Sequence, residues 1–94
     1  IDVRLEDILG LGFTEWRAIL PRLAEQKVLA SPHAWGAGLK SVYTGHLAAA
    51  LGHVPTIEGV TCGDEDVDPG GNRIVDGRFH PSTAPGFGLK LRRP

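Results

Sequence analysis

The sequence predicts an α/β fold in which parallel strands are joined by crossover helices and are followed by a loop-rich tail. Strand-type and helix-type hydrophobic patterns alternate over the first 60 residues, with short connections between them. Glycine and proline concentrate later, since 7 of the 13 glycines and 5 of the 7 prolines follow residue 52. We therefore expect two parts: residues 1–60 with regular elements, and residues 61–94 as the tail.

The chain opens with the pattern of a strand, a loop and a helix. Ile1–Leu5 alternates apolar and polar residues, which is typical of a short strand. Residues 8–13 are apolar but contain two glycines, so they are predicted to form a closely packed loop. Thr14 is a suitable N-cap for a helix that ends near Gln26. Pro21 lies inside this pattern and should kink the helix.

Two further strands are predicted in the first 60 residues. Val28–Ala30 is a short apolar run typical of a buried strand, and Ser31-Pro32 should end its pairing. Thr56–Val60 follows Pro55 and is predicted to be the third strand.

Between these two strands lies the clearest helical pattern of the sequence. Residues on one helical face recur with a helical period: Leu39, Val42, Tyr43, His46, Leu47, Ala50 and Leu51. Gly52 should close this helix. Because His46 lies on the apolar stripe, we expect it to be packed and hydrogen-bonded rather than to bind a ligand.

The tail is predicted to consist mostly of loops. Four carboxylates occupy positions 64, 65, 66 and 68, but the glycine and glutamate that an EF-hand needs are not at the required positions. We therefore interpret this acidic stretch as a solvated loop. Ile74–Phe79 has Asp-Gly at its centre and predicts a short hairpin, and residues 85–91 end in a brief alternating strand.

Composition excludes several classes of function. The net charge is −1, with no basic stripe for a nucleic acid. No apolar run approaches the roughly 20 residues of a membrane span, and no signal peptide opens the chain. The single Cys62 cannot form an internal disulfide, which favours a reducing, cytoplasmic compartment. Because the chain begins at Ile1 and contains no methionine, we expect it to be a fragment of a longer protein.

Ionisable residues follow each of the three predicted strands. Glu6 and Asp7 follow the first, His33 follows the second, and Glu58 lies near the end of the third. The carboxyl ends of parallel strands share one edge of a sheet, so these side chains can converge on one pocket. A carboxylate beside a histidine fixes its tautomer and raises its basicity, which suits proton abstraction from carbon. On spacing alone, they could also be unrelated polar residues at the starts of loops.

The succession of several short motifs resembles the C-terminal part of the enolase superfamily, in its mandelate racemase-like subgroup. The matching segments lie at residues 12–16, 31–36, 46–50, 57–58, 75–77 and 85–88. The resemblance implies a (β/α)₇β TIM-like barrel, of which residues 1–60 supply the last three strands and two helices. It also implies that residues 61–94 return toward a capping domain, which together with the rest of the barrel would lie outside this chain.

The resemblance further implies a set of roles. His33 matches the general base, with Asp7 or Glu6 as its acidic partner, and Glu58 matches the acid that helps to hold the substrate carboxylate or the enediolate. The implied activity is a dehydratase of a sugar acid that depends on Mg²⁺, whose ligands are expected outside this segment. We also expect the whole protein to form a homo-oligomer. A racemase or epimerase of a 2-hydroxy acid and a non-catalytic fragment remain the alternatives.

Overall fold

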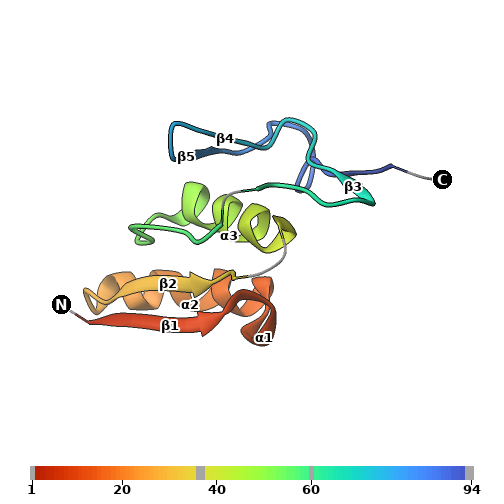
Figure 1. Cartoon of the computed structure of the whole chain (residues 1–94). Helices are drawn as coiled ribbons and strands as arrows, with labels where there is room; N and C mark the ends of the chain where they lie inside the picture. Colours follow the sequence, from red (N-terminus) through yellow and green to blue (C-terminus); the bar gives the residue numbers. More distant parts are fainter. Residues whose placement is uncertain (1, 36–37, 60, 93–94) are drawn as a thin grey trace.

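The computed structural model describes residues 2–35, 38–59 and 61–92, and it arranges them in three layers (Figure 1). The first layer is a two-stranded parallel sheet with two helices, formed by β1 (Val3–Asp7), α1 (Ile8–Leu11), α2 (Phe13–Glu25) and β2 (Leu29–His33). The second layer is α3 (Gly38–Leu51). The third is the tail, with β3 (Val67–Asp68), β4 (Arg73–Val75), β5 (Arg78–His80) and β6 (Lys90–Leu91).

The parallel pair predicted for the first two strands is confirmed. β1 and β2 pair in register from Val3 opposite Leu29 to Asp7 opposite His33, with α2 as the connection between them. The predicted end of the second strand at Ala30 is wrong, because β2 continues through Ser31 and Pro32 to His33.

Backbone hydrogen bonding explains why Pro32 does not end β2. The N–H of Leu29 donates toward the β1 side, to Asp2 O at 3.0 Å, whereas the N–H of Ala30 donates to His53 O at 2.9 Å on the other side. Because backbone groups alternate in direction along a strand, Pro32 lacks its N–H on the side away from β1. Its pairing with β1 is therefore unaffected.

The third predicted strand, Thr56–Val60, is wrong over the residues that the structure describes. Residues 56–59 form no regular structure, and Val60, like Ile1, lies outside the described residues. The segment does run beside β2, as the bond to His53 O shows. Pro32 and Pro55 each lack a donor for a ladder here, and Gly59 has a φ of 119° that leaves the extended region.

The helices of the first layer begin earlier than predicted. Residues 8–11 form the short helix α1 rather than a loop, because the Asp7 carboxylate caps the N–H groups of Leu9 and Gly10. α2 begins at Phe13 after Gly12, whose φ of 94° is accessible to glycine, so Thr14 is not its N-cap. The helix runs through Pro21 and ends at Glu25.

The hydrophobic core lies between α2, the sheet and α3. α2 contributes an apolar stripe with a helical period, and α1, β2 with the residue after it, and α3 contribute the other side chains. The buried members of this core are Ile8, Trp16, Leu20, Leu23, Ala30, Ala34 and Leu47. The two strands expose apolar residues on their other side, where Val3 is 52% and Leu5 is 60% exposed.

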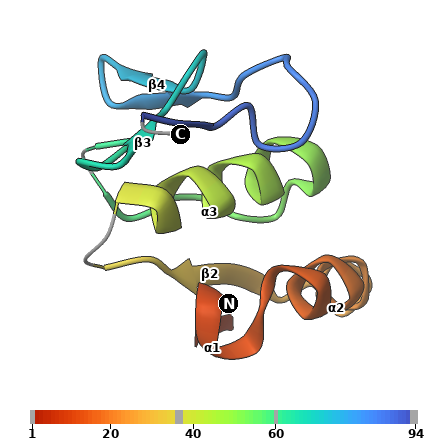
Figure 2. The same cartoon turned by 90° about the vertical axis from the view of Figure 1, so that its right-hand side faces the viewer.

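α3 is covered on two sides, by the first layer and by the tail (Figure 2). Its buried residues are accordingly not confined to one stripe, and include Ser41, Thr44 and Gly45. The expectation for His46 is confirmed: its Nε2 lies 2.7 Å from Oδ1 of the buried Asn72. Asn72 also donates to the carbonyls of Pro69 and Phe87, so this contact attaches the tail to α3.

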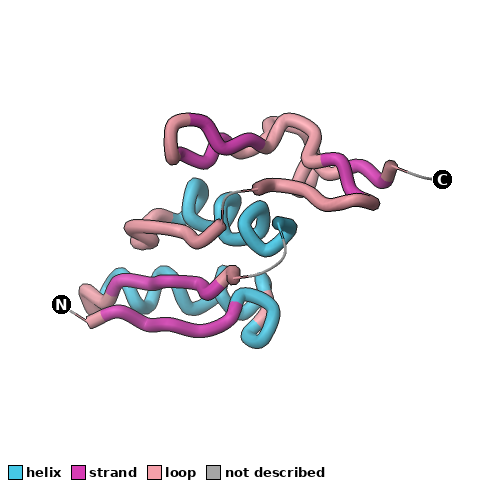
Figure 3. Tube along the Cα trace, viewed as in Figure 1, coloured by secondary structure: helices cyan, strands magenta, loops and turns pink. Residues whose placement is uncertain are grey.

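The predicted hairpin is confirmed, and the acidic stretch differs from its prediction. Val75 pairs with Arg78 across Asp76 and Gly77, which both have positive φ (50° and 73°), as a type I′ turn requires. Within the acidic stretch, Val67–Asp68 forms β3 and pairs with β6 instead of remaining a solvated loop. Asp64 makes this possible because its carboxylate accepts the N–H groups at 66 and 67. The brief final strand is confirmed as β6 (Figure 3).

Among the described residues, no helix is both long and apolar enough to cross a membrane. The division of the chain at residue 60 stays a prediction.

The packing of the hairpin on α3 predicts a strong effect of a single methyl group. A Cβ at Gly45 would overlap the ring of Phe79, so Gly45→Ala should displace β4 and β5 and lower the free energy of unfolding by about 1 to 3 kcal/mol. Gly10→Ala is the matched control, because its nearest neighbour is Asp7 Cβ at 3.4 Å. Thermal unfolding and amide exchange of residues 73–80 in the whole protein measure the effect. Equal behaviour of the two variants would contradict this packing.

Candidate active site

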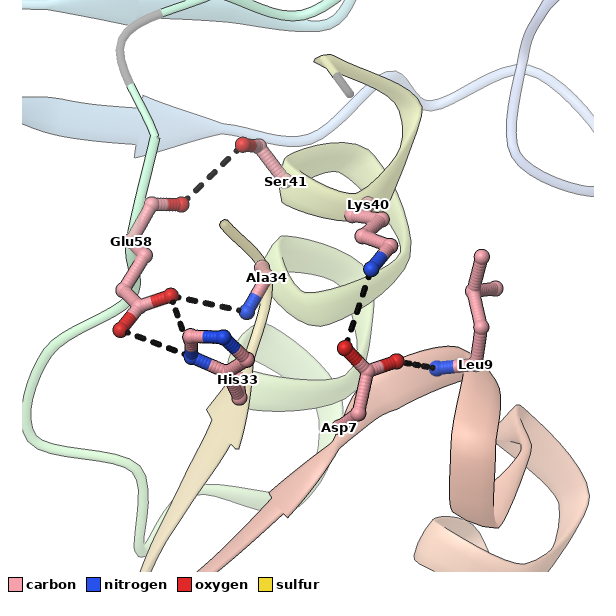
Figure 4. Close-up of polar contacts among 7 residues, drawn as sticks. All are labelled: Asp7, Leu9, His33, Ala34, Lys40, Ser41 and Glu58. Carbon is pink, nitrogen blue, oxygen red and sulfur yellow. Dashed lines mark hydrogen bonds and ion pairs between the residues drawn. The ribbon is translucent and has the colours of Figure 1, made fainter. Parts of the chain in front are cut away.

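Three of the predicted site residues lie near one another at the carboxyl end of the parallel sheet (Figure 4). His33 ends β2, Asp7 ends β1, and Glu58 belongs to the segment that follows α3. Two side-chain contacts organise this region, a hydrogen bond between His33 and Glu58 and an ion pair between Asp7 and Lys40.

His33 and Glu58 form the first pair. His33 Nδ1 lies 2.9 Å from Glu58 Oε2 and 3.1 Å from Oε1. An ionised carboxylate only accepts hydrogen bonds, so Nδ1 is the donor and carries the proton. In the neutral ring Nε2 then holds the lone pair, and among the described residues none bonds to Nε2. The side chain of His33 is 42% exposed, so Nε2 is accessible to a ligand.

Glu58 is held in position by its surroundings. Its Oε2 accepts the backbone N–H of Ala34 at 3.0 Å, and its own carbonyl accepts the hydroxyl of Ser41 at 3.0 Å. Gly59 permits this approach to α3, because a Cβ there would collide with the side chain of Ser41. The Ala34 N–H and then the His33 ring lower the pKa of Glu58, which keeps this carboxylate ionised beside the imidazole.

Asp7 forms the second pair and also caps α1. Its Oδ2 lies 3.0 Å from Lys40 Nζ, while Oδ1 accepts the N–H groups of Leu9 at 2.8 Å and Gly10 at 3.1 Å. The hydrogen bond from Lys40, followed by those from Gly10 and Leu9, lowers the pKa of Asp7 from 3.8 to about 2. Within the described residues, no hydrogen bond joins Asp7 to His33.

Glu6 is placed differently from the other candidates. Since paired residues of a parallel sheet share a face, Asp7 lies on the face of His33 and Glu6 lies on the opposite face with Pro32. The Glu6 carboxylate is 3.2 Å from Arg4 in an exposed pair. The structure therefore brings Asp7, His33 and Glu58 together and leaves Glu6 apart.

Two residues that contact this site were absent from the sequence prediction, Lys40 and Ser41. Both lie in the first turns of α3, directly after the segment that carries His33. A polar residue in the first turn of the helix that follows a parallel strand lies at the carboxyl end of the sheet, and that position is the signal that could have identified them.

The described residues do not form a metal site by themselves. Residues 2–35, 38–59 and 61–92 contain no group of three or more His, Cys, Asp or Glu side chains that could hold a metal ion. A hollow of about 520 Å³ is separate from the site: it lies between α3, residues 54–57 and residues 77–80, and His33 and Glu58 do not line it.

Comparisons with known proteins agree with this arrangement of elements. A family model described as enolase C-terminal domain-like matches residues 5–94, so the chain belongs to this family. No curated protein matches the chain.

Solved structures of this superfamily have the same fold. A mutant of galacturonate dehydratase from Geobacillus sp., complexed with Mg, is 33% identical, with a TM-score of 0.76 over 97% of this chain and 24% of that chain. A mandelate racemase/muconate lactonizing protein from Geobacillus sp., complexed with magnesium and tartrate, is 33% identical, with a TM-score of 0.77 over 99% of this chain and 24% of that chain.

A third structure carries bound sugar acids. It is galacturonate dehydratase from Geobacillus sp., complexed with D-galacturonate and 5-keto-4-deoxy-D-galacturonate. It is 33% identical, with a TM-score of 0.76, and the match covers 98% of this chain and 25% of that chain. The chain thus spans about a quarter of the length of the solved structures that it matches.

The Asp7–Lys40 pair predicts a pH-dependent contribution to stability. Because folding lowers the pKa of Asp7 from 3.8 to about 2, its contribution is fully present above pH 3.8 and is lost as the pH falls toward 2. Asp7→Asn retains a capping side chain but not this dependence. The stability difference between wild-type protein and this variant should therefore shrink as the pH falls below 4, measured by denaturant unfolding. A difference that grows on acidification would contradict the assignment.

Proposed function

We propose that the whole protein is a dehydratase of a sugar acid, in which His33 transfers the protons. The observation that carries this proposal is the contact of His33 Nδ1 with Glu58 at 2.9 Å, which leaves Nε2 as an accessible base. Membership of the enolase C-terminal domain-like family supports it, as do solved relatives described as galacturonate dehydratase.

The proposed reaction begins at the carbon next to the substrate carboxylate. Nε2 of His33 takes the proton from this carbon, and the C–H electron pair forms an enediolate. The protonated imidazole then donates its proton to the departing 3-hydroxyl, which leaves as water. The resulting enol becomes a 2-keto-3-deoxy acid when a proton is added at C3.

We further propose that residues 1–60 supply the last strands of a (β/α)₇β barrel and that the tail returns toward a capping domain. The exposed apolar side chains of Val3 and Leu5 support this, because they lie on the face of β1 and β2 that a closed barrel would bury. Pairing of the exposed edge of β1 with another strand would also satisfy its backbone groups.

The residues described here do not fit a magnesium site, as they contain no suitable group of ligands. The relatives crystallised with Mg are about four times longer than the matched region. We propose that any Mg²⁺ bound by the whole protein has its ligands outside the described residues.

The test of this function is His33→Asn in the whole protein. This change removes the base, so dehydration of the sugar acid should be abolished, and exchange of the α-proton with solvent deuterium should be lost with it. Product formation and deuterium incorporation are measured by NMR on the same samples.

His53→Asn is the matched control, because His53 is exposed and has a φ of 63°, which asparagine tolerates. The control should keep wild-type turnover. Retention of both reactions in His33→Asn would end the assignment of His33. Loss of dehydration with continued exchange would mean that His33 acts on the leaving group instead of as the first base.

A further inference from the structure

A large aromatic side chain is exposed two residues after His33. Trp35 is 76% exposed, whereas the other tryptophan of the chain, Trp16, is fully buried in the core. Indole rings are large and mostly apolar, and in folded proteins they are on average highly buried. The open ring of Trp35 therefore requires a partner that the described residues do not supply.

The pattern of burial shows on which face of the sheet Trp35 lies. Along β2 and the two residues after it, Ala30, Pro32 and Ala34 are buried, and the residues between them are more open. Successive side chains of an extended chain point to opposite faces, so Trp35 lies on the face of His33.

Trp35 also lies beyond the last pair of residues on that face. The pairing of β1 with β2 ends at Asp7 opposite His33. Two residues of extended chain advance by roughly 6 to 7 Å, so Trp35 follows His33 at the carboxyl end of the sheet. In the proposed barrel this end is the one that receives ligands. The advance is comparable to the length of the carbon chain of a sugar acid beyond its α-carbon.

Glu58 holds the backbone that carries this ring. Its Oε2 accepts the N–H of Ala34 at 3.0 Å (Figure 4). The Ala34 N–H lowers the pKa of Glu58 most, and the N–H of Trp35 lowers it as well, so one carboxylate attracts both backbone groups. The same carboxylate contacts His33 Nδ1. The imidazole and the backbone of Trp35 are therefore positioned by one group.

The chemistry of an indole face determines which part of a sugar acid it can bind. The face of an aromatic ring carries partial negative charge, so it attracts C–H groups and disfavours a carboxylate. A sugar acid has a carboxylate at one end, next to the carbon from which His33 takes the proton, and C–H and hydroxyl groups along the rest of its chain. The ring of Trp35 therefore suits the uncharged end of such a molecule.

We infer that Trp35 determines substrate specificity: its indole stacks on the carbon chain of the sugar acid beyond C3 and favours acids whose far end is uncharged. The identity of this ligand rests on the proposed function. Trp35 then contributes to binding of the long acids and contributes nothing to binding of an acid that ends at C3.

The first test compares acids of different length on the whole protein with Mg²⁺. The long acid is the one turned over fastest in a panel of six-carbon aldonic and uronic acids, and the short acid is glycerate, which ends at C3. Trp35→Ala should raise the KM of the long acid by about 10-fold, as expected for the loss of one aromatic contact, and leave kcat within about threefold. The inhibition constant of glycerate should not change.

Two further variants make this comparison specific. Trp35→Phe retains an aromatic face and should keep most of the affinity for the long acid. Leu51→Ala is the matched control, because Leu51 is also an exposed apolar residue but ends α3, roughly three turns after Lys40. This control should leave both constants unchanged. The preference of the wild-type protein for the long acid over the six-carbon diacid should shrink in Trp35→Ala.

The second test detects the contact without turnover. The difference in fluorescence emission between wild-type protein and Trp35→Phe isolates the signal of Trp35. This signal should change on titration with the long acid and stay constant with glycerate.

Three results would overturn the inference. An unchanged KM in Trp35→Ala would remove the contact, and an equal loss of affinity for the long acid and glycerate would mean that Trp35 supports the site through the rest of the protein. The third is a Trp35 emission that no acid of the panel changes. If no sugar acid is dehydrated, the proposed function fails, whereas the fluorescence titration with the same panel still decides whether Trp35 contacts a bound acid.

Discussion

The parallel register of β1 and β2 is the constraint on which the rest of the site depends. It places Asp7 beside His33 at one edge of the sheet and directs both side chains to the same face. The chain then turns into α1 after one strand and toward α3 after the other. The polar contacts of the site join this edge to α1, to α3 and to the segment after α3 that carries Glu58.

α3 connects this edge to the tail. Its first turns supply Lys40 to Asp7 and Ser41 to the Glu58 carbonyl, while His46 further along binds Asn72. One helix therefore contacts both the sheet edge that carries His33 and the loop-rich tail. Small residues make this possible, because Gly45 accommodates the ring of Phe79 and Gly59 accommodates Ser41. α3 is consequently buried on more than one side, whereas a single apolar stripe in its sequence predicts burial on one side only.

Much of this arrangement follows from local patterns. The parallel pair, the helix that ends before Gly52, the Asp76-Gly77 hairpin and the packed His46 were all predictable, since hydrophobic periodicity and turn residues indicate each of them. The errors arose where one particular hydrogen bond decides the outcome. Whether Pro32 ends a strand depends on which side its missing N–H faces. The capping of α1 by Asp7 and the pairing of β3 with β6 depend on contacts that periodicity does not report.

The site, too, was only partly predictable from the sequence. Their positions at the strand ends identified His33, Asp7 and Glu58 as neighbours, but these positions did not indicate which side chains form pairs. Asp7 pairs with Lys40, and the position of Lys40 on α3 becomes meaningful only when the helix is placed beside β1. The roles of these residues in catalysis stay predictions.

The most direct measurement of the central claim is the product that the whole protein forms from sugar acids in D₂O. Dehydration through an enediolate predicts a 2-keto-3-deoxy acid with one deuterium at C3, because the enol receives its proton from solvent. A sugar acid that is recovered without loss of water, or with only its α-centre inverted, would contradict the account.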